Sequence, residues 1–81
     1  MQMDERAIKI VHDYILERTV GMDRKFEVFT VWKSKVLQNW KYLLSTTLFD
    51  GMYYELTYDG DKEVWYLDAY RKQENRVIKN W

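Results

Sequence analysis

The stretch from Met52 to Tyr70 constrains the fold most, because it holds two β-rich runs joined by the dipeptide Asp59-Gly60. Asp and Gly both tolerate positive φ. An Asp-Gly pair between aromatic and β-branched runs is typical of a type I′ turn, whose twist matches that of the flanking strands. The sequence therefore predicts a β-hairpin, and a two-residue loop gives each residue before the turn a fixed partner after it.

This predicted register sorts the side chains of the hairpin onto two faces. Tyr54 pairs with Trp65 and Tyr53 with Tyr66, and successive side chains point to opposite faces. One face is apolar, and we expect a helix to cover it. Its members are Met52, Tyr54, Leu56, Trp65, Leu67 and Ala69. The other face mixes charges with aromatic rings, and we expect it to meet water. Its members are Tyr53, Glu55, Thr57, Lys62, Val64, Tyr66, Asp68 and Tyr70.

Chain length and composition limit how such a hairpin can be stabilised. The chain has 81 residues, no cysteine and one histidine. We expect a single domain, residues 1–81, without disulfides or Cys/His zinc sites. A chain this short buries only about 60 to 65 % of its unfolded surface. Its aromatic residues, 17 % of the chain, are the expected compensation, together with self-association.

The remaining compositional features indicate the compartment. The first residues show no basic region followed by an apolar core, and no run approaches the roughly 18 to 20 apolar residues of a membrane span. The absence of cysteine fits a reducing environment. We therefore expect a cytoplasmic protein with no membrane partner.

An N-terminal helix is predicted over residues 4–19, approximately. Asp4 is placed as its N-cap, and Val11 and Ile15 belong to an apolar stripe at helical spacing. Gly21 ends it. Residues 22–25 then form a polar connector to the first strand.

Four strands are predicted, at approximately residues 26–34, 39–47, 52–58 and 62–70, followed by a polar, basic tail at 71–81 that is frayed or forms a single turn. Residues 35–44 could also form a short helix. Strand is favoured because Trp40, Tyr42 and Leu44 alternate.

The first strand has no clearly polar face, so its orientation stays open. Phe26, Val28, Thr30 and Trp32 share one side in a regular strand, and Glu27, Phe29, Val31 and Lys33 share the other. The sequence as a whole predicts an α+β fold, in which the N-terminal helix packs on a four-stranded antiparallel meander sheet.

Charge lowers the expectation of nucleic-acid binding without removing it. Thirteen basic and thirteen acidic residues give a formal net charge of zero. The charges are unevenly placed, since residues 28–49 carry only Lys33, Lys35 and Lys41, whereas residues 50–68 are predominantly acidic. Such complementary regions also favour self-association.

Five runs of the chain carry a resemblance, and they are Val31-Trp32, Leu37 to Lys41, Leu43 to Leu48, Asp50 to Glu55, and Tyr66 to Tyr70. Together they resemble a family of small uncharacterised proteins of bacteriophages and prophages of Gram-positive bacteria. The resemblance implies a small phage-encoded accessory protein acting in the host cytosol. That family has no assigned activity, so the resemblance supplies no catalytic or binding residue.

No residue pattern predicts catalysis. His12 and Asp13 point about 100° apart on a helix, and the hydroxyl residues 45–47 have no neighbouring base. The acids within 59–63 have the alternate spacing of a calcium loop but lack its further donors. We therefore expect no enzymatic activity, cofactor or metal.

Two groups of residues are candidate binding sites. The first is the aromatic face of the hairpin. It comprises Tyr53, Tyr66, Tyr70 and Val64. The second is a basic and aromatic group. It comprises Trp32, Lys33, Lys35, Trp40 and Lys41. Trp and Tyr dominate protein-binding hot spots, and aromatics beside cations can stack bases for about 1 to 3 kcal/mol each.

These groups leave three interpretations open. The rings could simply lock the sheet by cross-strand pairing. They could bind protein, either a host protein such as a defence or replication factor, or a second copy in a homo-oligomer. The alternative is a binder of nucleotides or single-stranded nucleic acid, including a sponge for a signalling nucleotide.

Overall fold

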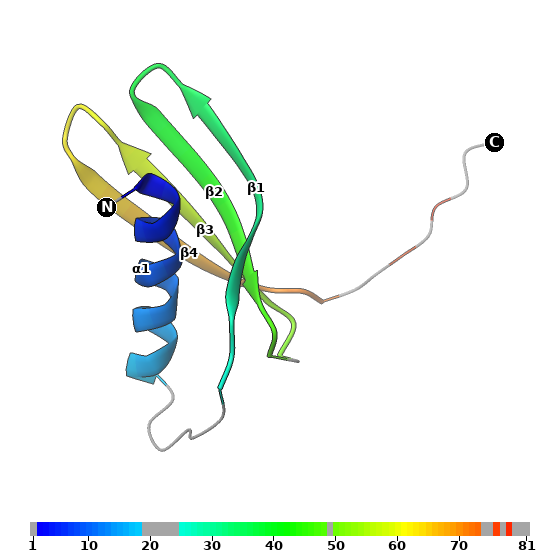
Figure 1. Cartoon of the computed structure of the whole chain (residues 1–81). Coiled ribbons are helices and arrows are strands. Elements are labelled where there is room, and N and C mark those ends of the chain that lie inside the picture. Colours follow the sequence, from blue (N-terminus) through cyan, green and yellow to red (C-terminus); the bar gives the residue numbers. More distant parts are fainter. Residues whose placement is uncertain (1, 19–24, 49, 74–75, 77, 79–81) are drawn as a thin grey trace.

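The computed structural model describes residues 2–18, 25–48, 50–73, 76 and 78. One helix precedes an antiparallel sheet with the strand order β1-β2-β3-β4 (Figure 1). The elements are α1 (Met3–Arg18), β1 (Val28–Val36), β2 (Asn39–Thr46), β3 (Met52–Asp59) and β4 (Val64–Arg71). This confirms the predicted α+β fold, with a helix followed by a four-stranded meander.

The segment 35–44 belongs to β1, a turn and β2, so the helical alternative is wrong. Strands β1 and β4 each begin two residues later than predicted. In β4 this is because residues 62 and 63 belong to the loop before the strand. Most of the predicted tail after Arg71, and residues 22–24 of the connector, lie outside the described residues.

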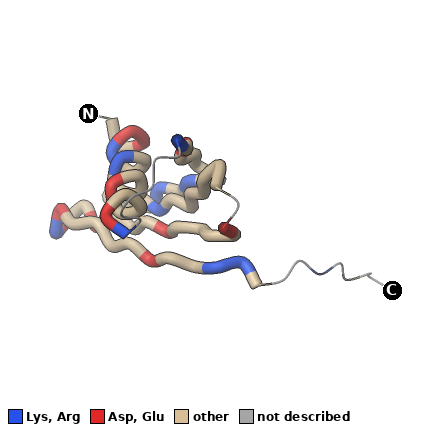
Figure 2. Tube along the Cα trace, turned by 90° about the horizontal axis from the view of Figure 1, so that it is seen from below, with Lys and Arg blue, Asp and Glu red and all other residues tan. Residues whose placement is uncertain are grey.

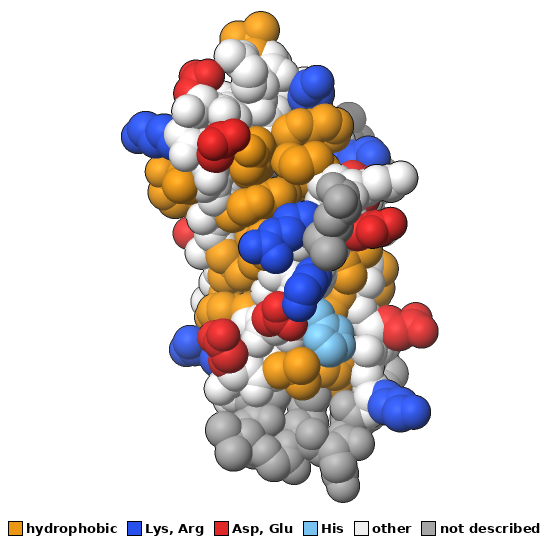
Figure 3. Space-filling model, turned by 60° about the vertical axis from the view of Figure 1, so that its left-hand side comes forward, with side chains coloured by type: hydrophobic (Ala, Val, Ile, Leu, Met, Phe, Trp, Pro, Cys, Tyr) orange, Lys and Arg blue, Asp and Glu red, His pale blue; other side chains and the backbone are white. Residues whose placement is uncertain are grey.

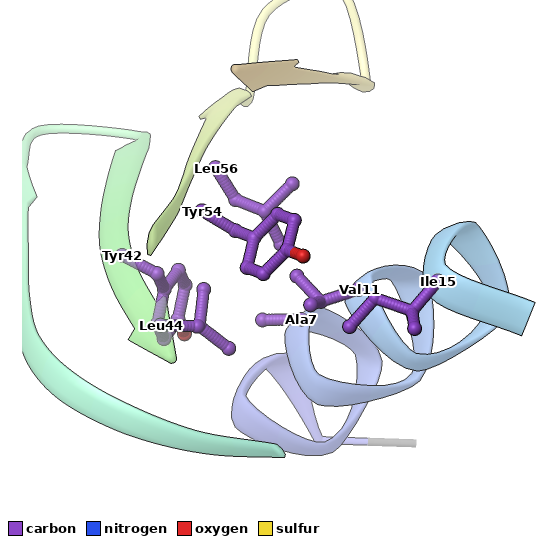
Figure 4. Packing of buried hydrophobic residues seen from close by; sticks show 7 residues of the cluster. All are labelled: Ala7, Val11, Ile15, Tyr42, Leu44, Tyr54 and Leu56. Carbon is purple, nitrogen blue, oxygen red and sulfur yellow. The ribbon is translucent and has the colours of Figure 1, made fainter. Parts of the chain in front are cut away.

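The core lies between α1 and one face of the sheet (Figure 4). Its fully or almost fully buried side chains come from α1, β2 and β3. They are Ala7, Val11, Ile15, Tyr42, Leu44, Tyr54 and Leu56. Trp65 and Leu67 pack against this cluster from β4. The helix therefore covers the face that the alternation of the hairpin predicted, and burial of this stripe stabilises α1 on the sheet.

Asp4 is not the N-cap of α1, which corrects the sequence prediction. The helix begins at Met3, and the backbone N–H of Arg6 donates to the carbonyl of Gln2 at 3.0 Å. The Asp4 carboxylate reaches the sheet instead, where it accepts hydrogen bonds from Tyr42 and Lys33. The carboxylate therefore accepts from these two side chains of the sheet instead of capping the backbone N–H groups of the helix.

The predicted register of the β3–β4 hairpin is wrong by four residues. Asp59 pairs with Val64 and Tyr53 with Tyr70, so the loop has four residues, Gly60 to Glu63. The Asp59 carboxylate accepts hydrogen bonds from the backbone N–H groups of residues 61 and 62, at 3.0 and 3.2 Å, which favours this longer turn. Glu63 rather than Gly60 has positive φ, at 55°. Because four is an even number, every side chain keeps its predicted face.

Gly60 serves a purpose other than the expected type I′ turn. A Cβ atom on Gly60 would lie 2.6 Å from the Cβ of Gln38, in the neighbouring β1–β2 turn. The two hairpin ends, at the same end of the sheet in Figure 1, are also joined by side-chain hydrogen bonds. Gln38 donates to Asp61 at 3.0 Å, and the Gly60 N–H donates to the Asn39 side chain at 3.1 Å. Glycine permits this close approach.

A β-bulge at Val31 sets the orientation of β1. Thr30 pairs with Leu44 and Trp32 with Leu43, so Val31 has no partner on β2. The extra residue reverses the alternation, so Trp32 shares a face with Phe29 rather than with Thr30.

Candidate functional site

The sheet face opposite α1 is the candidate functional site, and we call it the open face. Within the described part of the chain, no helix or strand covers it (Figure 1). The register of the strands places these side chains on it: Phe29, Trp32, Ser34 and Val36 of β1; Asn39, Lys41, Leu43 and Ser45 of β2; Tyr53, Glu55 and Thr57 of β3; Val64, Tyr66, Asp68 and Tyr70 of β4.

Apolar side chains lie along both outer strands of the open face, and its centre is more polar. On β1 and β4 the large apolar side chains are between 38 % and 66 % exposed. They are Phe29, Trp32, Val36, Val64, Tyr66 and Tyr70. The central strands contribute Lys41 and Glu55, whose charged atoms lie 3.6 Å apart. The outer strands of the open face are therefore mainly apolar and the central strands mainly polar, with Leu43 and Tyr53 as the apolar members of the centre.

A hollow of about 280 Å³ lies on this face at the β1–β2 end. Open-face residues make up most of its lining, together with Trp40 from the α1 side. The open-face members are Trp32, Ser34, Val36, Asn39, Lys41 and Thr57. Ser34 is small and stands between two large neighbours of the same strand face, which leaves the space open. The hollow can receive an apolar side chain from outside.

The predicted aromatic group is assembled as expected. Tyr53, Val64, Tyr66 and Tyr70 all lie on the open face, although Tyr53 pairs with Tyr70 and not with Tyr66. Among the described residues, the observed ring contacts involve no open-face tyrosine. Ring contacts such as the tilted pair of Trp65 and Tyr42, whose centroids lie 6.1 Å apart, occur instead on the α1 side.

The predicted basic and aromatic group does not form one surface, because successive side chains of a strand point to opposite faces of the sheet. The bulge sets which members of β1 lie on the open face. Lys33 bonds Asp4 at 2.7 Å on the α1 side. Lys35, on the same side, lies over the Trp40 ring at 5.2 Å. Trp32 and Lys41 lie on the open face. Each of the three lysines also has a partner within the chain, so they do not line a common path for phosphates.

Sequence reasoning missed Phe29, Ser34 and Val36 as members of the site. Placing the turn at residues 37–38 would have identified Ser34 and Val36. Side chains alternate between the two faces, and counting from that turn toward the N-terminus puts both on the same face as Trp32. No such signal exists for Phe29, because its face depends on the bulge.

The group around Asp4 is structural. Hydrogen bonds from Lys33 and Tyr42 lower the pKa of Asp4, and burial followed by the bond to Asp4 raises the pKa of Tyr42. Burial also raises the pKa of Tyr54. These shifts hold the carboxylate charged and the phenols neutral. A carboxylate with a lowered pKa is a weak base, so Asp4 is poorly suited to act as a general base.

A second hollow, of about 530 Å³, separates the C-terminal half of α1 from the start of β1. Its lining residues are His12, Leu16, Lys25, Phe26, Glu27 and Thr47. His12, pale blue in Figure 3, stacks on Phe26 at 4.6 Å, and Thr47 accepts the backbone N–H of Glu27 at 2.9 Å. These contacts involve the His12 ring, the Thr47 hydroxyl and the backbone of Glu27.

Among the described residues, no group of three or more His, Cys, Asp or Glu side chains is placed to hold a metal ion. Nor does that part of the chain contain a helix with the length and apolar character needed to cross a membrane.

The fold and the open face define a small α+β domain in which, among the described residues, one helix covers one side of the sheet. The chain belongs to a family of unknown function, DUF6275, whose model matches residues 4–80. Comparisons with curated proteins and with solved structures found no match.

Proposed function

We propose that this protein is a small, non-catalytic accessory protein, of the kind that phages and prophages encode, and that it binds another folded protein through the open face. The resemblance of its sequence to small phage proteins supports the accessory role. One structural observation carries the binding role: six large apolar side chains of two outer strands are exposed together on one face.

The size of the open face favours protein binding. Strands about 4.8 Å apart, rising about 3.3 Å per residue, give four strands of about eight residues a footprint of roughly 500 Å². The apolar side chains of both outer strands lie within this footprint, and the largest exposed apolar patch of a monomeric protein, typically about 300 to 600 Å², is often functional. Trp32, Tyr66 and Tyr70 are of the residue types that contribute most to protein interfaces.

Charge supports protein rather than nucleic acid as the partner. In Figure 2, acidic and basic residues are interspersed along α1, and scattered charges lie along the strands. On the open face, Lys41 is paired with Glu55, and Glu55 is in register with Asp68. A binder of single strands needs a groove of unpaired cations along the backbone.

A double variant of the open face tests this proposal. Trp32→Thr with Tyr70→Thr removes two exposed rings and replaces them with a β-branched residue that suits a strand. Leu16→Gln is the matched control, because Leu16 is similarly exposed, at 48 %, but lies on α1. Circular dichroism and unfolding curves first establish that all variants fold.

Binding is then measured with purified components. Complexes of defined stoichiometry are identified by light scattering, both for the chain alone and for proteins of the bacterial host that co-purify with it and are then produced separately. We expect the double variant to lose the complex and the control to retain it. A complex that persists in the double variant contradicts the proposal. So does salt-sensitive oligonucleotide binding that disappears when Lys33, Lys35 and Lys41 are neutralised.

A further inference from the structure

We infer that the partner of the open face is a second copy of this chain, packed face to face about a two-fold axis that runs along the strands. This inference rests on the proposed binding role and names the partner. The order of apolar and polar strands is its first support. A two-fold axis along the strands, between two stacked sheets, places β1 of one copy over β4 of the other and β2 over β3.

This arrangement places the mainly apolar outer strands over each other and the mainly polar central strands over each other. One row departs from the pattern, because Trp32, Leu43, Glu55 and Asp68 are in register and Trp32 therefore faces Asp68 of the second copy. A two-fold interface requires such self-complementarity, because the same surface serves both copies. The zero formal net charge of the chain imposes no overall repulsion between copies.

The hollow on the open face supplies an independent observation. The strand register places Ser34, Lys41, Thr57 and Tyr66 in one row across the sheet. The two-fold axis maps the Tyr66 end of this row onto the Ser34 end of the second copy. Tyr66, 49 % exposed, then faces the hollow that Trp32, Ser34 and Val36 line. The same contact occurs twice in the dimer.

The area of the open face is sufficient for such a dimer. Two footprints of roughly 500 Å² bury roughly 1,000 Å², at the lower bound for a specific interface. The association is therefore expected to depend on concentration, with monomer and dimer both observable.

Two single variants and their mixture test the contact. Tyr66→Ser removes the protruding ring, and Ser34→Tyr fills the hollow. Each change occurs twice in a homodimer, so each should weaken association by roughly 30-fold or more. An equal mixture of the two variants should restore the dimer. The ring introduced at position 34 of one variant then faces the space vacated at position 66 of the other, and the second contact keeps both native side chains. Leu16→Gln serves as the control that retains wild-type association.

Mass and cross-linking measurements give the readout. Sedimentation or light scattering over a concentration series should show wild type moving from 10.1 kDa toward twice that mass. The chain has no cysteine, so Thr57→Cys introduces a single thiol near the centre of the open face, and Glu17→Cys introduces one on α1 as control. A short bis-maleimide should link two copies through the first position and not through the second.

The possible outcomes separate this inference from the proposed function. A dimer that forms but does not cross-link at position 57, or a mixture that does not associate better than its components, overturns the face-to-face pairing. A chain that stays monomeric and binds a host protein through the open face overturns the second copy as partner and leaves the proposed function standing. If the chain is a monomer and its complexes form equally well with every open-face variant, both the inference and the proposed function are overturned.

Discussion

The phenolic hydroxyl of Tyr42 donates a hydrogen bond of 2.8 Å to a carboxylate oxygen of Asp4, and this contact joins the first turn of α1 to the middle of β2. The other carboxylate oxygen accepts a hydrogen bond of 2.7 Å from Lys33 of β1. The start of the helix is thus bound to two adjacent strands. Tyr42 is fully buried, so its hydroxyl depends on Asp4 for its partner.

Tyr42→Phe should destabilise the protein by about 1 kcal/mol, the typical net contribution of a hydrogen bond. The ring keeps its place in the core, so no cavity forms. Tyr66→Phe is the matched control, because its hydroxyl lies on the exposed open face, and its effect should stay within about 0.5 kcal/mol. Urea unfolding of the dilute monomer measures both. Equal stability of Tyr42→Phe and wild type would contradict a stabilising role for this bond.

Stability should fall in acid through Asp4. Hydrogen bonds from Lys33 and Tyr42 lower the pKa of the folded state below the ordinary value of 3.8. The contribution of Asp4 is therefore fully present above that value and is lost as pH falls through the folded pKa. Asp4→Asn should lower stability at neutral pH and flatten the decline of unfolding free energy below about pH 4.

The control for the acid experiment is Asp13→Asn. Asp13 pairs with Lys9 at 3.0 Å on the exposed side of α1, where ion pairs contribute little. Unfolding free energies are compared between neutral pH and about pH 3, on either side of the ordinary carboxyl pKa. A slope that is as steep in Asp4→Asn as in wild type would assign the acid sensitivity to other groups.

The sequence was sufficient to predict the fold because the spacing of apolar residues is a local signal, and the contacts between helix and sheet bury the same residues. Val11 and Ile15 are spaced for a helix, and Tyr54 and Leu56 alternate toward it. The faces of β3 and β4 were correct even though their register was wrong, because the error was even. The face of a side chain depends only on whether the register shift is odd or even. Its cross-strand partner depends on the loop length, and the hydrogen bonds that the Asp59 side chain accepts in the turn favour a longer loop.

The sequence did not predict which face of the sheet Trp32 occupies, because that face depends on a single unpaired residue. Val31 resembles any other strand residue, yet its bulge places Trp32 on the open face and Lys33 on the α1 side. The role of Asp4 was missed for a related reason. Its partners are 29 and 38 residues away, and only the assembled sheet brings them within hydrogen-bonding distance.

Gly60→Ala should destabilise the protein by about 1 to 3 kcal/mol through overpacking. The added Cβ would lie 2.6 Å from the Cβ of Gln38 and would also meet its carbonyl oxygen. Gln38→Ala should not rescue the variant, because the backbone carbonyl remains. Gly51→Ala is the comparison, since φ there is 70° and the nearest atom, the Lys72 carbonyl oxygen, is 3.7 Å away.

The two glycines thus separate two physical costs. Strain of the left-handed conformation at Gly51 should amount to roughly 1 to 2 kcal/mol, whereas the cost at Gly60 comes from contact between the hairpin ends. Thermal and urea unfolding measure the stabilities. A Gly60→Ala variant as stable as wild type would show that the two ends separate without cost.

Leu37→Gly should stabilise the protein. Leu37 lies in the β1–β2 turn with φ of 58°, a conformation that costs a side chain with a Cβ roughly 1 to 2 kcal/mol. Its side chain is 82 % exposed, so its removal sacrifices no core contact. Glycine's greater freedom in the unfolded chain offsets roughly 0.5 to 1 kcal/mol of the relief. A net gain of about 0.5 to 1 kcal/mol in unfolding free energy is expected.

Leu37→Val is the matched test of this reasoning, because a β-branched residue is poorly suited to positive φ and should lower stability. Opposite signs for the two variants in urea unfolding are expected from backbone strain. If both variants lose stability, an interaction of the leucine side chain must outweigh the strain.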